Sequence, residues 1–497
     1  MLSMLVVANT CLIGVPRAAC QDTEPVRDIS DGSRQLFLDD WLVASATNIE
    51  RVQGSPTKHP DNPIIRRDKP WDQGRADLYG NGVYDPENER IQLFYAANNV
   101  FEGHEDRLAY AESRDGGETW IKPELGLIPF GEAQNTNLVL LPPSQTMHGP
   151  CVFRDEHEAD PAKRYKLFTA SYPDTAYLGI PRIYEHRGEY LYATEDAQVP
   201  DGCDLPGLFV AYSPDGIHWP TTPVRVSDML SDTTQRAFWD DRIQKYVAYI
   251  RARTANDRSV ARMESDDFET WGAPEVVLEG TPEQCIYAMG VTQYEGLYVG
   301  TPWIFDRGSE AAGGPVIWPE LAVSRDGRSW DRPFPGQPLI PNGPAGSGDS
   351  RQIRMSASMV VLEDKILLLY GQTDRPHVVD MRVEIGAATL RLDGLAAMEA
   401  GETEGTILTN PLRFERGRLH VNASVDGGGY VKAELLHDGA VVRGYDLARS
   451  RAVTTDSLSA PLTWKNRGTV PAADEGEWRI RFSLRNASLY SFWIEPR

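Results

Sequence analysis

Four carboxylates and one histidine stand at equivalent positions of a repeated pattern in this chain. Each lies just before an apolar run that is typical of a β-strand: Asp77, His148, Asp232, Glu283 and Asp349. Carboxylates brought close together repel one another, so some keep a proton near neutral pH while others stay ionised. A protonated carboxyl and a carboxylate are the pair that hydrolysis of a glycosidic bond requires. The four carboxylates Asp77, Asp232, Glu283 and Asp349 are therefore candidates for this acid and base chemistry.

Other side chains around these positions are suited to binding a sugar. Tyr79 follows Asp77 by two residues and should point to the same face of its strand. Amides and guanidinium groups can bond hydroxyls, and indole rings can cover a sugar ring, although each such side chain can instead be a packed aromatic or a solvated charge. The substrate-binding candidates are Asp349, His148, Tyr79, Asn137, Arg236, Arg251, Arg351, Trp71 and Trp303. No metal-binding motif and no cofactor motif is present, so we expect neither a metal nor a cofactor.

A recurring turn sequence indicates how the chain positions these groups. The frame Ser-x-Asp followed by a Trp occurs at 113–120, 213–219, 265–271 and 324–330, with a weaker echo at 390–395. Asp bonds its own backbone two residues on, Gly supplies a positive φ, and Trp fills the gap between strands. The frame resembles the Asp-box of sialidases and many other propellers. We expect no chemistry at its acids Asp115, Asp215, Asp266 and Asp326.

The turns divide residues 75–395 into five similar units. Each unit has an apolar run, a short turn, an aromatic-rich run and an alternating strand, as in GNGVYDPENERIQLFYAA at 80–97. Four strands repeated five times predict an all-β fold, a five-bladed β-propeller whose inner strands converge on one funnel. A β-sandwich with coincidental turns is the alternative. In a propeller, the five residues at the strand starts would meet at the mouth of the funnel.

The rest of the chain divides into three further segments. Residues 21–74 lead into the propeller, and residues 396–404 (AAMEAGETE) form a short acidic linker. Strict alternation of apolar and polar residues over 405–497 predicts a small C-terminal antiparallel β-sandwich with an accessory role.

Composition limits the partners and the compartment. Asp+Glu 72 against Lys+Arg 50 gives a net charge of −22, which disfavours nucleic acid. The apolar run over residues 1–20 predicts a signal peptide, hence a secreted or periplasmic bacterial protein, and no segment is long enough to span a membrane. Beyond it, Cys151, Cys203 and Cys285 are an odd number without a CxxC motif, so neither a disulfide framework nor a thiolate zinc site is expected.

The five-unit organisation resembles the five-bladed propeller superfamily of glycoside hydrolases, families 32, 43, 68, 117 and 130. By the family 43 pattern, the resemblance implies a catalytic base at Asp77, an orienting residue at Asp232 and the acid at Glu283. The whole chain, including FLDDWLV at 37–43 and LYSFW at 489–493, is also similar to secreted bacterial family 32-like glycosidases. The Asn-Asp-Pro-Asn signature of family 32 is absent.

Several functions are compatible with these residues. The first is a secreted glycoside hydrolase that acts on plant or algal poly- or oligosaccharides, with either stereochemical outcome. The second is a glycoside phosphorylase, for which Arg236, Arg251, Arg253, Arg351 and Arg354 can supply a phosphate site. A sialidase-like enzyme and a propeller that binds carbohydrate without catalysis are further alternatives.

Overall fold

The described part of the chain is all-β, as the sequence predicts, and most of its strand pairs are antiparallel. The computed structural model describes residues 25–98, 106–143, 147–171, 182–186, 189–193, 207–229, 231–308, 313–377 and 382–496. Within these ranges the helical structure is a single 3₁₀ turn, η1 (Pro161–Lys163), and no helix there is long and apolar enough to cross a membrane. The predicted signal peptide over residues 1–20 and most of the segment 171–207, including Cys203, lie outside the described residues.

The first two repeat units are separate four-stranded sheets. The first runs in the order β6 (Arg75–Asp85), β7 (Arg90–Asn98), β8 (Arg107–Ser113) and β9 (Leu138–Leu140). The second contains β10 (His148–Arg154), β11 (Tyr165–Ser171), β14 (Gly207–Ser213) and β15 (Val224–Ser227). The units therefore follow the strand order of the sequence, apart from the segment between β11 and β14.

The third unit is enlarged by that segment. It contains β16 (Arg236–Asp240), β17 (Lys245–Thr254), β18 (Asp257–Ser265) and β19 (Glu275–Glu279). The hairpin of β12 (Arg182–His186) and β13 (Glu189–Ala193) joins it through a parallel bridge between Tyr184 and Arg253. The long insertion predicted in the second unit thus adds strands to the third.

The fourth and fifth units share one nine-stranded sheet, joined by a parallel bridge between Ile317 and Gln352. The fourth comprises β20 (Gln284–Tyr294), β21 (Leu297–Asp306), β22 (Val316–Pro319) and β23 (Ala322–Ser324). The fifth comprises β24 (Gln352–Met355), β25 (Val360–Val361), β26 (Lys365–Thr373) and β27 (Glu384–Arg391), with β5 (Thr57–Lys58) at its edge.

Hydrogen bonds link the first strands of all five units in a closed series. The linked pairs, in order, are Asn81 with Val152, Ala237 with Cys151, Arg236 with Val291, Val291 with Ala357, and Ala357 with Gly80. The series begins and ends on β6, so the five inner segments surround a common axis. Asp77 and His148 belong to the first strands of the first and second units, β6 and β10.

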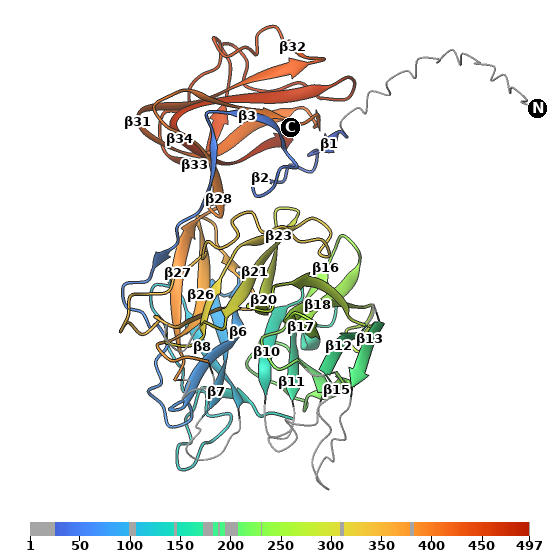
Figure 1. The fold of residues 1–497 in the computed structure, drawn as a ribbon, viewed down its shortest axis with the longest axis vertical. Coiled ribbons are helices and arrows are strands. Elements are labelled where there is room, and N and C mark those ends of the chain that lie inside the picture. The colour runs from blue at the N-terminus through green and yellow to red at the C-terminus, as the bar shows by residue number, and fades with distance from the viewer. Residues whose placement is uncertain are drawn as a thin grey trace, which may run out of the picture.

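A fifth sheet of eleven strands lies beyond one end of these units, at the top of Figure 1. Its C-terminal strands are β28 (Ala396–Ala400), β29 (Gly405–Thr409), β30 (Leu412–Arg413), β31 (Gly417–His437), β32 (Ala440–Val441), β33 (Ser457–Leu462) and β34 (Trp478–Pro496). Four N-terminal strands complete it: β1 (Arg27–Asp28), β2 (Gln35–Leu36), β3 (Val43–Thr47) and β4 (Glu50–Gln53).

Two predicted segments are thereby corrected. Residues 396–400 of the expected linker 396–404 are the strand β28, which pairs with β34 and β4 because its alanines and Met398 are buried. Residues 27–53 of the segment 21–74 belong to the same sheet rather than only leading into the repeats. The pairing partners of the N-terminal strands lie more than 340 residues away in the chain, as with Glu50 and Glu399, and strand alternation alone does not specify them.

Bonds across the junction hold the eleven-stranded sheet against the repeat units. The buried carboxylate of Asp393 accepts hydrogen bonds from Arg34 at 2.8 Å, Asn422 at 2.9 Å and Ser491 at 2.6 Å. Arg325 donates to both carboxylate oxygens of Asp39, at 2.7 and 3.0 Å.

The Ser-x-Asp turns close the outer hairpins with one bonding pattern. In the first, Asp115 accepts from the backbone N–H groups of Glu118 and Thr119, and the Trp120 indole donates to the Gly117 carbonyl at 3.0 Å. In the third turn this role falls to Asp267, while Asp266 pairs with Lys245 at the surface. The expectation that Asp266 serves the turn was wrong by one residue, because Asp267 stands two residues after Ser265, as Asp115 does after Ser113. Phe268 takes the positive φ that Gly supplies in the other turns.

Candidate functional site

The inner strands change register at the same end of the molecule. On β6 the pairing with β7 shifts between Asp77 and Asn81, and on β10 the pairing with β11 shifts between His148 and Cys151. On β20 the shift leaves Tyr287 as the extra residue between Ile286 and Ala288. Bulges of this kind turn a side chain away from the regular alternation, and they are common beside active sites.

A glycine permits the close approach of two of these strands. Gly149 has φ +65°, and a Cβ at this position would lie 2.0 Å from the carbonyl oxygen of Thr233. Thr234 in turn donates its hydroxyl to the carbonyl of Tyr79 at 2.8 Å. The segment before β16 is therefore pressed against both β6 and β10, which brings Asp232 toward Asp77 and His148.

Two tyrosines form the centre of the resulting cluster. The hydroxyl oxygens of Tyr79 and Tyr287 lie 3.2 Å apart, and both rings stack on the Trp303 ring, with centroid distances of 5.8 and 5.9 Å. Burial raises the pKa of Tyr79 well above its ordinary value, and the proximity of Tyr287 adds to the effect. The phenol of Tyr79 therefore stays protonated and can donate a hydrogen bond.

Each of two buried aspartates in the cluster is paired with a buried arginine. Asp77 Oδ2 lies 3.2 Å from Arg354 Nη1, and Asp232 bonds to Arg251. Asp77 is 1% exposed, and its Oδ1 has no hydrogen-bond partner among the described residues. Burial alone would lower the pKa of Arg251, but the Asp232 carboxylate raises it overall, so this arginine is charged at any working pH.

Two histidines border the cluster. His148 packs edge-on against Tyr79 at 4.8 Å, and His377 packs edge-on against Tyr287 at 5.1 Å. Burial lowers the pKa of both, and for His377 the charges of Arg258, Arg354 and Arg251 contribute to a value of about 3. Both rings are therefore neutral near pH 7.

A third acid and base pair lies on the side of His148. Arg75, at the start of β6, bonds both carboxylate oxygens of Asp106, at 3.0 and 3.2 Å. The Asp106 carboxylate raises the pKa of Arg75, with a smaller contribution from Asp77. We call the set Asp77, Tyr79, Arg75, Asp106, His148, Asp232, Arg251, Tyr287, Arg354 and His377 the axial cluster.

The structure brings five of the sequence candidates into the axial cluster: Asp77, Tyr79, His148, Asp232 and Arg251. Glu283 is exposed and lies just before β20, four residues ahead of Tyr287. Trp303 belongs to the floor of the cluster, but it is 0% exposed and cannot offer a face to a sugar. The prediction of an aromatic platform at Trp303 is therefore wrong.

The other candidates have structural contacts elsewhere. Asn137 accepts from the Trp71 indole at 2.7 Å and donates to Tyr95 and Tyr110 inside the first unit, so Trp71 and Asn137 are core residues. Asp349 pairs with Lys58, and Arg236 donates to the backbone of Val291 at 2.9 Å. The Arg351 backbone bonds Ile317 and Thr373, which joins the fourth and fifth units.

Sequence reasoning missed Tyr287, His377, Arg75 and Asp106. A signal for Tyr287 was present, because Tyr79 and Tyr287 begin the matching stretches YGNGV and YAMGV. Asp106 precedes β8 and His377 follows β26, at positions that no repeated sequence pattern marks. Only the folded chain identifies these two residues.

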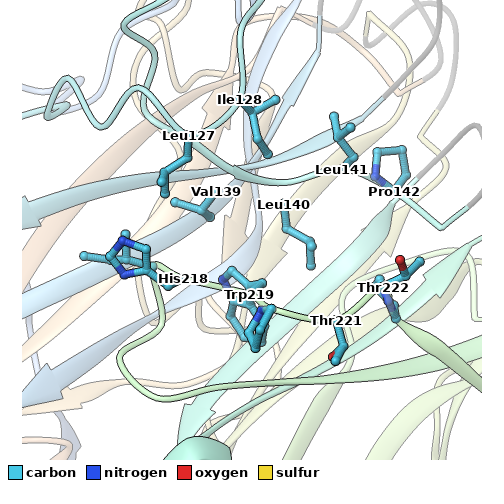
Figure 2. Close-up of a pocket in the computed structure, with 13 residues that line it drawn as sticks. Leu127, Ile128, Val139, Leu140, Leu141, Pro142, His218, Trp219, Thr221 and Thr222 are labelled. Carbon is cyan, nitrogen blue, oxygen red and sulfur yellow. The ribbon is translucent and has the colours of Figure 1, made fainter.

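An apolar groove of about 640 Å³ lies apart from the axial cluster, between the first and second units. Figure 2 shows its two sides, formed by Leu127, Ile128 and Val139–Pro142 and by Ile217–Pro223. It shares no lining residue with the axial cluster, and none of the described residues that line it is a carboxylate.

Comparisons with known proteins give similarity in structure only. No model of a known family matches the sequence, and no curated protein matches it. Among solved structures, the chain is similar to a fructofuranosidase from Schwanniomyces occidentalis bound to fructosylnystose, with 12% identity over 89% of this chain and 99% of the other and a TM-score of 0.44.

Two other glycosidases show comparable similarity. A glycosyl hydrolase from Bacteroides ovatus is 15% identical over 72% of this chain and 96% of its own, with a TM-score of 0.44. An α-L-arabinofuranosidase from Podospora anserina is 12% identical over 68% and 96%, with a TM-score of 0.39. At these scores the functional argument rests on the residues of the axial cluster.

Proposed function

We propose that this chain is a glycoside hydrolase whose active site is the axial cluster. The observation that carries the proposal is Asp77: a buried carboxylate, fixed through Oδ2 by Arg354, with Oδ1 left without a partner among the described residues. A carboxylate that is held in place on one oxygen and available on the other is suited to take a proton from water or to attack an anomeric carbon.

The neighbouring groups fit the remaining roles. Asp232, fixed by Arg251, supplies a second negative charge near the developing oxocarbenium ion, and the phenols of Tyr79 and Tyr287 can donate to substrate oxygens. We assign the acid to Glu283, whose exposed position before β20 leaves it free to approach a leaving group. The substrate in this proposal is a plant or algal poly- or oligosaccharide.

The same proposal includes the architecture and compartment. We interpret the five linked units as the blades of a five-bladed β-propeller, because their inner strands form the closed series described above, and the eleven-stranded sheet as an accessory β-sandwich. We propose that residues 1–20 direct export.

Substitution of the two carboxylates tests the assignment. Asp77→Asn and Glu283→Gln should each lower turnover at least about 100-fold on a panel of furanoside and pyranoside substrates. Asp155→Asn is the matched control, since Asp155 is also a buried carboxylate with a basic partner, Lys166 at 2.8 Å, but lies outside the cluster. Melting temperatures of all three variants separate lost chemistry from lost folding.

The outcomes distinguish the alternatives. Unchanged turnover in Glu283→Gln would show that Glu283 is not the general acid. Unchanged turnover in Asp77→Asn would overturn the proposed site. Binding of oligosaccharides without any product would favour a carbohydrate-binding propeller.

A phosphorylase is the second candidate, favoured by the arginines of the axial cluster. Arg251 and Arg354 are both buried beside carboxylates, where they could hold a phosphate nucleophile. A rate that depends on inorganic phosphate would identify phosphorolysis.

A further inference from the structure

The side chain of Arg354 carries more hydrogen-bond donors than its surroundings use. It is 0% exposed, and Nη1 bonds Asp77, while Nε and Nη2 have no partner among the described residues. A buried guanidinium with two unused donors is costly unless a further acceptor completes it. An oxygen of a bound ligand would be such an acceptor.

A second arginine faces the same region with an unused donor. Arg258 lies over the rings of Tyr287 and Phe305, at 5.3 and 5.2 Å, and its Nε has no partner among the described residues. Arg251 lies over the Tyr287 ring at 4.3 Å. Tyr287 is thus bordered by two guanidinium groups, and the Arg354 guanidinium lies 5.1 Å from the ring of its partner Tyr79.

Arginines outnumber carboxylates around these rings. Asp257 alone pairs with Arg253 at 2.5 Å, with Arg258 at 3.0 Å and with Arg307. With the pairs Arg251–Asp232 and Arg354–Asp77, five arginines share three aspartates. The single carboxylate of Asp257 is thus shared by three guanidinium groups, of which Arg258 lies over the Tyr287 ring.

His377 completes this side of the cluster as a neutral group. It packs edge-on against Tyr287 and Phe305, at 5.1 and 5.2 Å, and its Nδ1 has no partner among the described residues. It can therefore add a hydrogen bond without adding or cancelling charge.

We propose that Arg258, Arg354 and His377 form a subsite for an oxyanion, a carboxylate or sulfate carried by the sugar or a free inorganic phosphate. Planar guanidinium groups bind such oxyanions through paired N–H donors, and stacking on Tyr287 holds Arg258 in position for this. The proposal deepens the proposed function, on which its assignment to a carbohydrate substrate rests. It implies that the enzyme selects acidic glycans, or else that it uses phosphate in place of water.

Titration calorimetry on the full chain tests the subsite separately from catalysis. The probes are an oligogalacturonate, a sulfated galactan oligosaccharide, a neutral arabino-oligosaccharide and inorganic phosphate. Arg258→Gln should weaken binding of an oxyanion probe about 10- to 100-fold, the range for a hydrogen bond to a charged group. The side chain of Arg258 is 16% exposed, and Arg253 and Arg307 still neutralise Asp257 in the variant, so we expect it to fold.

Arg467→Gln is the matched control. Arg467 also stacks on a tyrosine, Tyr445 at 4.7 Å, but lies in the eleven-stranded sheet. It should leave all four titrations unchanged, and raising the salt concentration should weaken only oxyanion binding.

Binding of an acidic oligosaccharide that Arg258→Gln weakens would support a subsite for an acidic sugar. Binding of phosphate together with phosphate-dependent turnover of a neutral sugar would support the subsite with phosphate as its ligand. If no oxyanion probe binds, or if Arg258→Gln binds each one as the unmodified chain does, the subsite is overturned. The proposed hydrolase function would still be supported in that case if the chain hydrolysed a neutral sugar and Asp77→Asn abolished that hydrolysis. The two proposals can therefore fail independently.

Discussion

The hydroxyl oxygens of Tyr79 and Tyr287 lie 3.2 Å apart, although 208 residues separate them in the chain. One comes from β6 and the other from β20, and both occupy positions where the strand register shifts. The contact joins the first unit directly to the fourth across the axis. It places both hydroxyl groups in the axial cluster together with Asp77.

Removal of one hydroxyl should impair binding or turnover more than folding. Tyr287→Phe keeps the ring that stacks on Trp303 and loses one hydrogen bond, which costs about 1 kcal/mol of unfolding free energy. We expect kcat/KM on the active substrate to fall about tenfold or more. Tyr95→Phe, which removes a buried hydroxyl from the core of the first unit, is the control. Equal effects of the two substitutions on kcat/KM would argue against a role for Tyr287.

Removal of one partner of the Asp232–Arg251 ion pair should lower the unfolding free energy strongly. Both side chains are buried, so Asp232→Asn leaves the charge of Arg251 uncompensated and should lower the unfolding free energy by roughly 3–5 kcal/mol. The double variant Asp232→Leu, Arg251→Met should cost less, because no buried charge remains. Urea denaturation of the three proteins measures the difference. A double variant less stable than the single one would contradict this account.

Stability should decrease with acid partly through His377. Its pKa is about 3 in the folded chain and about 6.5 when unfolded, so the unfolded chain binds more protons between these values. The resulting stability is therefore complete above about pH 6.5 and is lost progressively as the pH falls toward 3. His377→Gln should flatten the decline in unfolding free energy between about pH 7 and pH 5. The same measurement on His437→Gln, in the eleven-stranded sheet, controls for loss of a histidine as such.

Adjacent aspartates in the third Ser-x-Asp turn should differ sharply in their importance. Asp267 accepts bonds from the backbone N–H groups of Glu269 and Thr270, whereas Asp266 pairs with Lys245 at the surface. We expect Asp267→Ala to cost about 1–2 kcal/mol of unfolding free energy and Asp266→Ala less than about 1 kcal/mol. Neither should change turnover, since the turn lies at the outer hairpins. Comparable losses in the two variants would show that the assignment of the turn residue is mistaken.

The sequence predicted the local structure of the chain, its strands and turns. Strand alternation, the Ser-x-Asp turns and the repeated units predicted an all-β fold, and the position before each inner strand indicated Asp77, Asp232 and His148. The prediction of an all-β fold succeeded because it depends on neighbours within a few residues, where side-chain period and turn chemistry decide the conformation.

Only the tertiary structure decided which groups share the axial cluster. The bulges on β6 and β20 turned Tyr79 and Tyr287 toward each other, and packing across the axis paired Asp77 with Arg354, 277 residues away. It also assigned Trp71, Asn137 and Asp349 to structural contacts, although their types suit a binding site equally well. The physical reason is that a local sequence fixes the direction of a side chain relative to its own strand. Which strand faces it depends on how all the sheets close around one axis.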